Sequence, residues 1–469
     1  MKDIKLLLMY LNTSTLDPHF NNFLPMAEKL LMDPPLGLWY LKAMAQRAGY
    51  RADVMDQRIH PINCEGLLNK IHNDGYAAVG FYNCAYGLMQ KKVLQYVKDI
   101  KDKSNIFVMV GGPPTESEDL FNAGLDLKCH GEGELTLLEI LEYLKGNRNI
   151  SDVKGISYRR PNGTIDTTSP RELIEDLDDI PFPALDPSEI PFYGNMGIIS
   201  NRRPTMVCMA TRGCPMRCTY CTSHYHWGNK YRKRSTDNVV AELTHYRHSF
   251  GARFIHFRDD ILCIDEKWFM DLCDKLIQAR LGLHWICNIY PTLLEENTEE
   301  KLRKMKAAGC NTIHIGLQSA SPEMLKRIKR KPEEPQILAR KLKIAQKLGI
   351  LTYVDFIFGL PGETEKTMEI TRKWIMETRP HYLAIWALAK LEGSEIEREY
   401  GDKRVTELTD DQIEKGISRT KNQFFRNPIV LLKIFWFLLT KNPYFFFYAV
   451  KLIPAGLSLI GFKRLKKHW

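Results

Sequence analysis

Residues Thr211–Cys221, with the sequence TRGCPMRCTYC, place three cysteines in one short segment. Their C-x3-C-x2-C spacing lets three thiolates surround a single soft-metal centre. Three ligands favour an iron–sulfur cubane with one open iron, whereas a structural zinc site closes with a fourth ligand, here His224 or His226. The polar neighbours Arg217 and Thr219 predict an exposed loop, which argues against a third interpretation, three buried cysteines without a metal. The candidate metal ligands are Cys214, Cys218 and Cys221.

This segment follows the first of six short apolar runs between residues 205 and 390, each typical of a buried strand. Helical patterns separate the runs. Six strand–helix repeats predict a partial (β/α)6 barrel, with its site at the carboxyl ends of the strands. The expected strands are Met206–Ala210, Arg253–Phe257, His284–Ile289, Thr312–Leu317, Leu351–Phe358 and Tyr382–Leu388.

Residues 1–150 show a second alternation of strands and helices, which predicts a doubly wound α/β domain with a parallel sheet. Ligands of such sheets bind beyond the carboxyl ends of the strands. Glycines follow the strand at 106–110, and a Gly-Glu-Gly-Glu loop begins at Gly131, so both positions suit a ligand. The expected strands are Ile4–Tyr10, Arg51–Met55, Ala77–Phe81 and Ile106–Val110, with a helix over Leu36–Ala48.

Two further regions complete the expected organisation. Residues 151–204 are rich in Gly, Pro, Asp, Ser and Thr, which predicts a hairpin turning at Pro161–Gly163 and then an extended linker. Residues 391–469 are expected to form a helical, basic and aromatic C-terminal region. The overall fold class is therefore α/β with a helical C-terminal region.

Charge is distributed unevenly along the chain. Lys and Arg number 66 against 56 Asp and Glu, but no acidic residue follows Glu414, while residues 415–469 hold eleven Lys and Arg. The rest of the chain is nearly neutral, which argues against nucleic-acid binding. Eleven scattered cysteines and no leader-like N-terminus predict a reducing, cytoplasmic location.

The C-terminal region 420–469 combines aromatic residues with lysines spaced about eight to ten residues apart. Lysines and prolines interrupt every apolar run before it reaches the ~18 to 20 residues of a spanning helix. Peripheral contact with a membrane and a helical cap on the rest of the protein are both consistent with this pattern.

Four motifs together resemble the radical S-adenosylmethionine (SAM) enzymes, specifically those with an N-terminal cobalamin-binding domain. Arg212–Cys221 is similar to the cluster loop of that family. Phe257–Asp260 (FRDD) resembles the acidic motif after the second barrel strand. Ile315–Ser319 (IGLQS) is similar to the glycine–acid–serine segment, with Gln318 where a glutamate is usual, and Phe358–Thr364 (FGLPGET) resembles the turn after the fifth strand.

The resemblance implies a [4Fe–4S] cluster on the three cysteines, with SAM bound to the open iron and cleaved to a 5′-deoxyadenosyl radical. For each expected SAM contact, the alternative is a structural role, in which a side chain at the end of a strand only forms hydrogen bonds with nearby backbone groups. The resemblance implies SAM contacts at Tyr220, Asp259, Asp260, Gln318, Ser319 and Gly359.

The resemblance also implies cobalamin in the N-terminal domain, where glycines let the backbone approach a large ligand. The alternative is a domain that has lost this ligand and only packs on the barrel. Asp17–Asn22 is a near match to a cobalt-ligating histidine motif but lacks its glycine, so we expect no histidine from this chain on cobalt. The candidate contacts are Pro35, Gly37, Gly111, Gly112, Pro113, Gly131, Glu132, Gly133 and Glu134.

The expected function is methylation of an unactivated carbon in a small-molecule substrate, and the C-terminal region motivates a hydrophobic or lipid-like one. Radical cyclisation, rearrangement or carbon–carbon bond formation with the same cofactors is the enzymatic alternative. A zinc-stabilised binding protein is the alternative of another class. The family resemblance adds a flavodoxin- or ferredoxin-type electron donor, and the sequence names no catalytic residue beyond the cofactor contacts.

Overall fold

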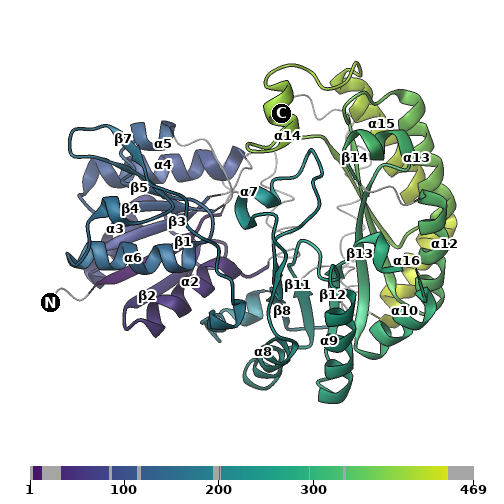
Figure 1. The fold of residues 1–469 in the computed structure, drawn as a ribbon, viewed down its shortest axis with the longest axis horizontal. Coiled ribbons are helices and arrows are strands. Elements are labelled where there is room, and N and C mark those ends of the chain that lie inside the picture. The colour runs from purple at the N-terminus through teal and green to yellow at the C-terminus, as the bar shows by residue number, and fades with distance from the viewer. Residues whose placement is uncertain are drawn as a thin grey trace.

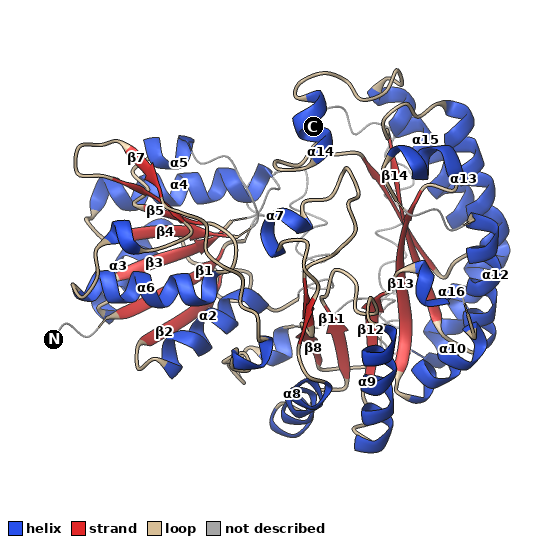
Figure 2. Cartoon of the chain, viewed as in Figure 1, coloured by secondary structure: helices blue, strands red, loops and turns tan. Residues whose placement is uncertain are grey.

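The computed structural model describes residues 4–12, 33–83, 87–112, 118–193, 200, 202–294, 296–330 and 334–441. Two sheets organise these residues, each with its own layers of helices (Figures 1 and 2). The predicted fold class, a doubly wound domain followed by a partial barrel and helices, is confirmed.

The first sheet has the strand order β2-β1-β3-β4-β5-β6-β7, parallel through β5 and antiparallel beyond it. The expected hairpin forms β6 and β7 and extends this sheet at its edge. Its strands are β1 (Lys5–Tyr10), β2 (Arg51–Asp56), β3 (Ala78–Tyr82), β4 (Phe107–Gly111), β5 (Leu127–Cys129), β6 (Ile156–Arg159) and β7 (Ile165–Thr167).

Helices cover both faces of this sheet because its side chains alternate between two cores. In β1, Leu7 and Met9 pack in one core with α3 and α4, while Leu6 and Leu8 pack in another with α2 and α6. The helices are α2 (Leu36–Arg47), α3 (Cys64–Asp74), α4 (Gly87–Lys103), α5 (Glu118–Asn122) and α6 (Gly133–Lys145).

The second sheet has six strands in the order β15-β14-β13-β12-β11-β8, and every pairing in it is parallel. A register irregularity lies in β13 between Gly316 and Gln318. The strands are β8 (Thr205–Cys208), β11 (Phe254–Phe257), β12 (His284–Asn288), β13 (Cys310–Gln318), β14 (Leu351–Phe358) and β15 (Tyr382–Ala387).

Helices cover the outer face of the second sheet, whereas its other face is turned towards the N-terminal domain (Figure 1). The largest core of the described residues lies between this sheet and those helices. The helices are α8 (Thr236–Ser249), α9 (Glu266–Ala279), α10 (Thr298–Ala307), α11 (Pro322–Arg327), α12 (Pro335–Lys347) and α13 (Glu365–Thr378).

Shorter elements join these layers and follow them. A two-stranded ladder and α7 carry the cysteine loop, and three helices end the described chain. These elements are β9 (Thr211–Arg212), α7 (Ser223–Trp227), β10 (Arg232–Lys233), α14 (Glu395–Tyr400), α15 (Asp410–Phe425) and α16 (Pro428–Lys441). The remaining turns are 3-10 helices at Ile150–Asp152, Leu177–Asp179, Ile190–Phe192 and Pro291–Leu294.

Candidate functional site

The three cysteines lie in the loop between β9 and β10, beside the carboxyl ends of the second sheet. Cys214 and Cys218 are buried, and Cys221 is half-buried. The loop is fixed from two sides, because the Thr219 N–H donates to the Ile328 carbonyl (3.2 Å) and its carbonyl accepts from the Ile396 N–H (3.0 Å). The cysteines are therefore held in place by backbone contacts from two other elements.

Electrostatics at the three thiols suit a metal cluster. Burial, together with the nearby Asp260 carboxylate and the neighbouring cysteines, raises the pKa of Cys214 to about 12 and that of Cys221 to about 11. Thiolates are thus costly here unless positive metal ions compensate them. The residues present fit a cluster that supplies this charge.

An iron–sulfur cluster and a single metal ion require different arrangements of their protein ligands. Within the described part of the chain, no three His, Cys, Asp or Glu side chains converge to hold one metal ion. A cubane binds each thiolate at a different iron, so its ligands need not meet at one point, whereas the four ligands of a tetrahedral zinc must. Three cysteines in one segment suit the iron–sulfur interpretation, which needs three protein thiolates and leaves one iron open.

Arg330, which the sequence reasoning missed, lies against the cysteine loop. Its guanidinium Nη1 is 3.8 Å from Cys218 Sγ and 3.3 Å from the Tyr220 hydroxyl. The same guanidinium stacks over the Tyr290 ring at 5.0 Å. It provides a cation next to the cluster ligands, suited to a carboxylate. Arg330 follows a run of basic residues and belongs to no recognisable motif, so the sequence did not indicate that it lies in the site.

Gln318 completes this part of the site. Its φ of 71° lies in the left-handed region, which a glutamine rarely adopts. A Cβ on Gly316 would lie 2.4 Å from Gln318 Nε2 and 4.0 Å from Arg330 Nη2, so Gly316 makes room for both side chains. The structure thus brings Tyr220 and Arg330 to Cys218, while Gln318 and Arg330 both approach Gly316.

Asp259 and Asp260 flank the start of the cysteine loop. Asp259 Oδ1 accepts from the Ala210 N–H (3.0 Å) and the Thr211 hydroxyl (2.7 Å), while no described residue forms a hydrogen bond with its buried Oδ2. Burial raises the pKa of Asp259 to about 7. Asp260 accepts from the Ser223 hydroxyl. Asp259 therefore braces the loop through Oδ1, and SAM contacts of Asp259 and Asp260 stay predictions.

Ser319 and Gly359 make other contacts. The fully buried Ser319 hydroxyl accepts from the Ser321 N–H (3.1 Å) and lies 3.3 Å from the Thr371 hydroxyl. A Cβ on Gly359 would lie 2.9 Å from Ile413 Cδ1 of α15, at a φ of 85°. These contacts account for both residues within the protein, and their SAM contacts stay predictions.

Glu363 holds the turn after β14. Its Oε2 accepts from the Gly359 N–H (2.5 Å) and the Leu360 N–H (3.2 Å), and its buried Oε1 has no hydrogen-bond partner within the described ranges. Burial raises the pKa of Glu363 from 4.5 to about 7. The signal that could have found it was its place in FGLPGET, where the sequence reasoning chose only the glycine.

We predict that Glu363→Gln removes a pH dependence of stability. A carboxyl whose pKa rises on folding binds its proton more tightly in the folded state, so the free energy of unfolding falls as pH rises from about 4.5 to about 7. The melting temperature of the variant, relative to wild type, should therefore rise between about pH 4.5 and about pH 8. Thermal unfolding with the exposed Glu365→Gln as control checks this, and a pH-independent difference would contradict it.

The predicted cobalamin contacts lie near the carboxyl edge of the first sheet, which faces α7 and the second domain (Figure 1). A Cβ at Gly37 or Gly131 would meet open space, whereas one at Gly112 would lie 2.0 Å from the Asn83 carbonyl. Open glycine positions fit a bulky ligand. Pro35 caps α2, Gly111 ends β4 and Gly133 begins α6. Pro113 and the Asp17–Asn22 motif fall outside the described residues.

Glu132 and Glu134 have partners within the protein. Glu132 Oε1 accepts from Arg212 (3.0 Å) and lies 2.9 Å from Arg232, and Glu134 Oε1 accepts from Arg212 at 2.5 Å. Arg212 lies two residues before Cys214. These pairs join the first domain to the cysteine loop, and the sequence reasoning, which proposed cobalamin contacts, did not foresee them.

Two family profiles match this chain. The profile of the radical SAM superfamily matches residues 209–375, and that of the B12 binding domain matches residues 31–141. The first match contains the cysteine loop, and the second contains the Gly-Glu-Gly-Glu loop at Gly131.

Two curated proteins are similar along most of their length. An uncharacterised methyltransferase of Pyrococcus horikoshii is 28% identical over 423 residues, covering 85% of this chain and 89% of that protein. The cytidylyl-2-hydroxyethylphosphonate methyltransferase of Streptomyces wedmorensis is 26% identical over 424 residues, covering 78% and 77%.

Solved structures share the fold. The radical S-adenosylmethionine methyltransferase TsrM of Kitasatospora setae, solved with cobalamin and a [4Fe–4S] cluster, superposes with a TM-score of 0.66 at 17% identity, covering 84% of this chain and 74% of that one. The cobalamin-dependent radical enzyme OxsB superposes with a TM-score of 0.64 at 18% identity, covering 90% and 56%.

Proposed function

Residues 209–375 belong to the radical SAM superfamily and residues 31–141 are a B12 binding domain, and from this premise we propose that the chain methylates an unactivated carbon of a small molecule. The resemblance inferred from the four motifs is confirmed, and so are its cofactors, a [4Fe–4S] cluster, SAM and cobalamin. The chain is an enzyme of the cobalamin-dependent radical SAM methylating family.

One observation carries the proposal: the cysteine loop and the carboxyl edge of the B12 binding domain meet directly. Buried ion pairs of Arg212 with Glu132 and Glu134 join them. A substrate held between the two domains would face both sites, as methyl transfer requires. Bound there, the cluster and SAM supply a 5′-deoxyadenosyl radical that removes hydrogen from the substrate, and cobalamin supplies the methyl group.

We assign the protein's own residues as follows. Cys214, Cys218 and Cys221 hold the cluster. Arg330 and Tyr220 lie beside Cys218 and orient the charged amino-acid end of SAM. Gln318 presents its amide next to Arg330, and the partnerless oxygen of Asp259 accepts a hydrogen bond from the ligand. The residues thus bind and orient SAM, and burial of the loop excludes water.

The inner face of the second sheet favours a substrate with a hydrogen-bonding group. His314 Nε2 lies 2.7 Å from Asp355 Oδ2, and the imidazole stacks on Tyr353 at 3.9 Å. Side chains alternate along a strand, and the neighbours Ile313 and Ile315 pack in the outer core, so His314 lies on the inner face. A pure hydrocarbon would desolvate this pair and give no hydrogen bond to the buried Asp355 Oδ1, which has no partner among the described residues.

Isotopic labelling tests the proposal. The reconstituted enzyme is incubated with methyl-deuterated SAM, a reductant and candidate substrates, and the products are analysed by mass spectrometry. Deuterated methyl in the product supports methylation. Formation of 5′-deoxyadenosine with an unlabelled, rearranged or cyclised product would instead support the alternative radical reaction.

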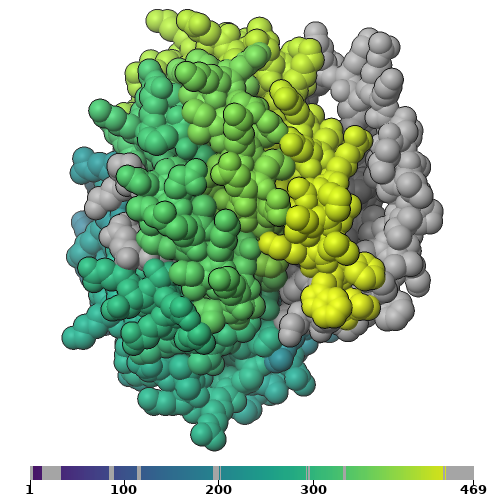
Figure 3. Space-filling view, turned by 90° about the vertical axis from the view of Figure 1, so that its right-hand side faces the viewer, coloured from purple at the N-terminus to yellow at the C-terminus, as the bar shows by residue number. Residues whose placement is uncertain are grey.

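A surface of α16 supports a second proposal, contact with a lipid surface. In Figure 3 this helix lies on the outside of the molecule. Leu432 is 65% exposed, and no acidic residue follows Glu414. No helix of the described ranges is long and apolar enough to cross a membrane. An exposed apolar helix face beside a basic segment suits the interface of anionic bilayers. The exposed apolar residues are Ile429, Leu431, Leu432, Phe435, Trp436 and Leu439.

We predict that Leu432→Lys weakens sedimentation of the protein with anionic vesicles. Burying a leucine side chain contributes about 1.5–3 kcal/mol, of which the new lysine regains about 1 kcal/mol at an anionic surface, so the vesicle affinity should fall about 2- to 30-fold. The buried side of the same helix offers a control in Val430→Ala, which removes no exposed surface. Equal sedimentation of wild type and Leu432→Lys would show that α16 is a structural cap.

A further inference from the structure

Two arginines close the base of the cysteine loop. Arg212 of β9 lies directly opposite Arg232 of β10 in their antiparallel ladder. Their side chains are 4% and 2% exposed, so both charges are buried. Like charges opposite one another destabilise a strand pair, and buried charges without partners are costlier still. The base of the loop therefore needs buried anions.

The Gly-Glu-Gly-Glu loop of the other domain supplies these anions. Glu132, whose side chain is 2% exposed, lies 3.0 Å from Arg212 and 2.9 Å from Arg232, and Glu134 takes a second bond from Arg212. Glu132 is itself held, because its Oε2 accepts from the Ile174 N–H at 2.8 Å. One carboxylate thus bridges both arms of the loop.

Further contacts make the arrangement rigid. Arg232 donates to the carbonyls of Ile174 (2.6 Å) and Trp227 (3.1 Å), and the Arg212 guanidinium lies 4.8 Å from the centre of the Trp227 ring. A Cβ at Gly213 would lie 2.2 Å from the Lys230 carbonyl, so the two arms pack closely just before Cys214. Any separation of the arginines would displace this first cysteine.

We propose that Glu132 and Glu134 are positioning residues for the iron–sulfur cluster, so that the B12 binding domain completes the cluster loop of the radical SAM domain. Neutralising Glu132 leaves two buried arginines opposed, and the arms of the loop separate. Outer contacts that orient metal ligands typically change metal affinity by about 10- to 100-fold. The proposal requires a bound cluster but not methyl transfer, so failure of methylation leaves its test intact.

The test is the rate at which the anaerobic, reconstituted protein releases iron to a chelator. Glu132→Gln keeps the shape of the side chain and removes its charge. We expect iron release at least about 10-fold faster than from wild type. Cobalamin binding, measured by visible absorption, should stay at the wild-type level. Glu134→Gln leaves the bond between Arg212 and Glu132 in place, so its rate of iron release should increase less. This variant replaces Glu132→Gln in the test if Glu132→Gln does not fold.

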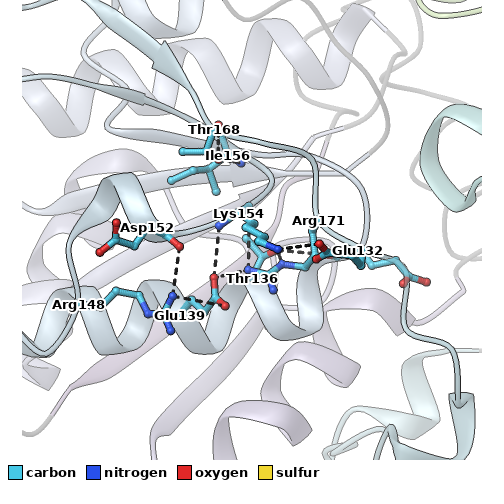
Figure 4. Close-up of polar contacts among 10 residues, drawn as sticks. Glu132, Thr136, Glu139, Arg148, Asp152, Lys154, Ile156, Thr168 and Arg171 are labelled. Atoms are coloured by element: carbon cyan, nitrogen blue, oxygen red, sulfur yellow. Dashed lines mark hydrogen bonds and ion pairs between the residues drawn. The ribbon is translucent and has the colours of Figure 1, made fainter.

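Glu139→Gln is the matched control. This acid lies in α6, and Figure 4 shows its carboxylate against Arg171, Arg148 and the Lys154 backbone, none of which belongs to the cysteine loop. Loss of an ion pair should lower its melting temperature without faster iron release. If Glu132→Gln releases iron at the wild-type rate, the proposal is overturned. This holds if only the melting temperature falls, and it holds if cobalamin binding is lost. The latter result would make Glu132 a cobalamin contact.

Discussion

Replacing Cys218 by serine is expected to abolish cluster binding and SAM cleavage. Cys218 is buried, and Arg330 lies 3.8 Å from its sulfur. Serine cannot supply the soft thiolate that iron prefers. Replacing residues that only orient metal ligands typically lowers metal affinity or activity by about 10- to 100-fold. Loss of a ligand itself should therefore lower 5′-deoxyadenosine formation by at least about 100-fold. Iron content and chromatographic detection of the nucleoside measure both effects.

Cys64→Ser controls for loss of any thiol, because Cys64 is a half-buried cysteine of α3 in the other domain. It should retain the iron and activity of wild type. Full iron content and unchanged SAM cleavage in Cys218→Ser would exclude the assigned ligand set.

Replacing Arg330 by glutamine is expected to weaken SAM binding while the cluster stays bound. The guanidinium contacts Tyr220 and stacks on Tyr290 beside the cysteine loop. Hydrogen bonds to charged groups contribute about 1.5–3 kcal/mol, which corresponds to roughly 10- to 100-fold in affinity. Titration of the reconstituted protein with SAM, followed by the change in its cluster spectrum, gives the dissociation constant.

Two further variants test whether the effect on SAM affinity is specific to the guanidinium of Arg330. Arg330→Lys keeps the charge but loses the planar fork of donors, so its affinity should lie between those of wild type and Arg330→Gln. Arg327, an exposed residue of α11 paired with Glu323, offers a control whose replacement by glutamine should leave SAM affinity unchanged. Equal affinity of Arg330→Gln and wild type would remove Arg330 from the site.

Local pattern was sufficient to predict the two sheets. Runs such as Leu351–Phe358 match β14 at both ends, because alternate apolar residues of this strand pack in the outer core. The antiparallel ladder of β9 and β10 was not predicted, since its strands have two residues each. The hairpin of β6 and β7 was expected, but its place at the edge of the first sheet depends on tertiary pairing.

The site was predictable where one segment carries the chemistry. The cysteine triad is contiguous, so its spacing indicated its function. Arg330 and Cys218, which lie in contact, are 112 positions apart in the sequence, and the paired Arg212 and Glu132 are 80 positions apart. Such pairs depend on how the domains pack, which spacing does not encode. Gly359 looked like a ligand-binding glycine, yet its close neighbour is Ile413 of α15.

The most direct test of the account is whether SAM binds to the cluster itself. The reduced protein is prepared with SAM labelled with nitrogen-15 in its amino group, and electron–nuclear double resonance is recorded on the cluster signal. The account predicts a hyperfine coupling to the label that disappears with unlabelled SAM. A cluster signal without that coupling, unchanged by SAM, would contradict it.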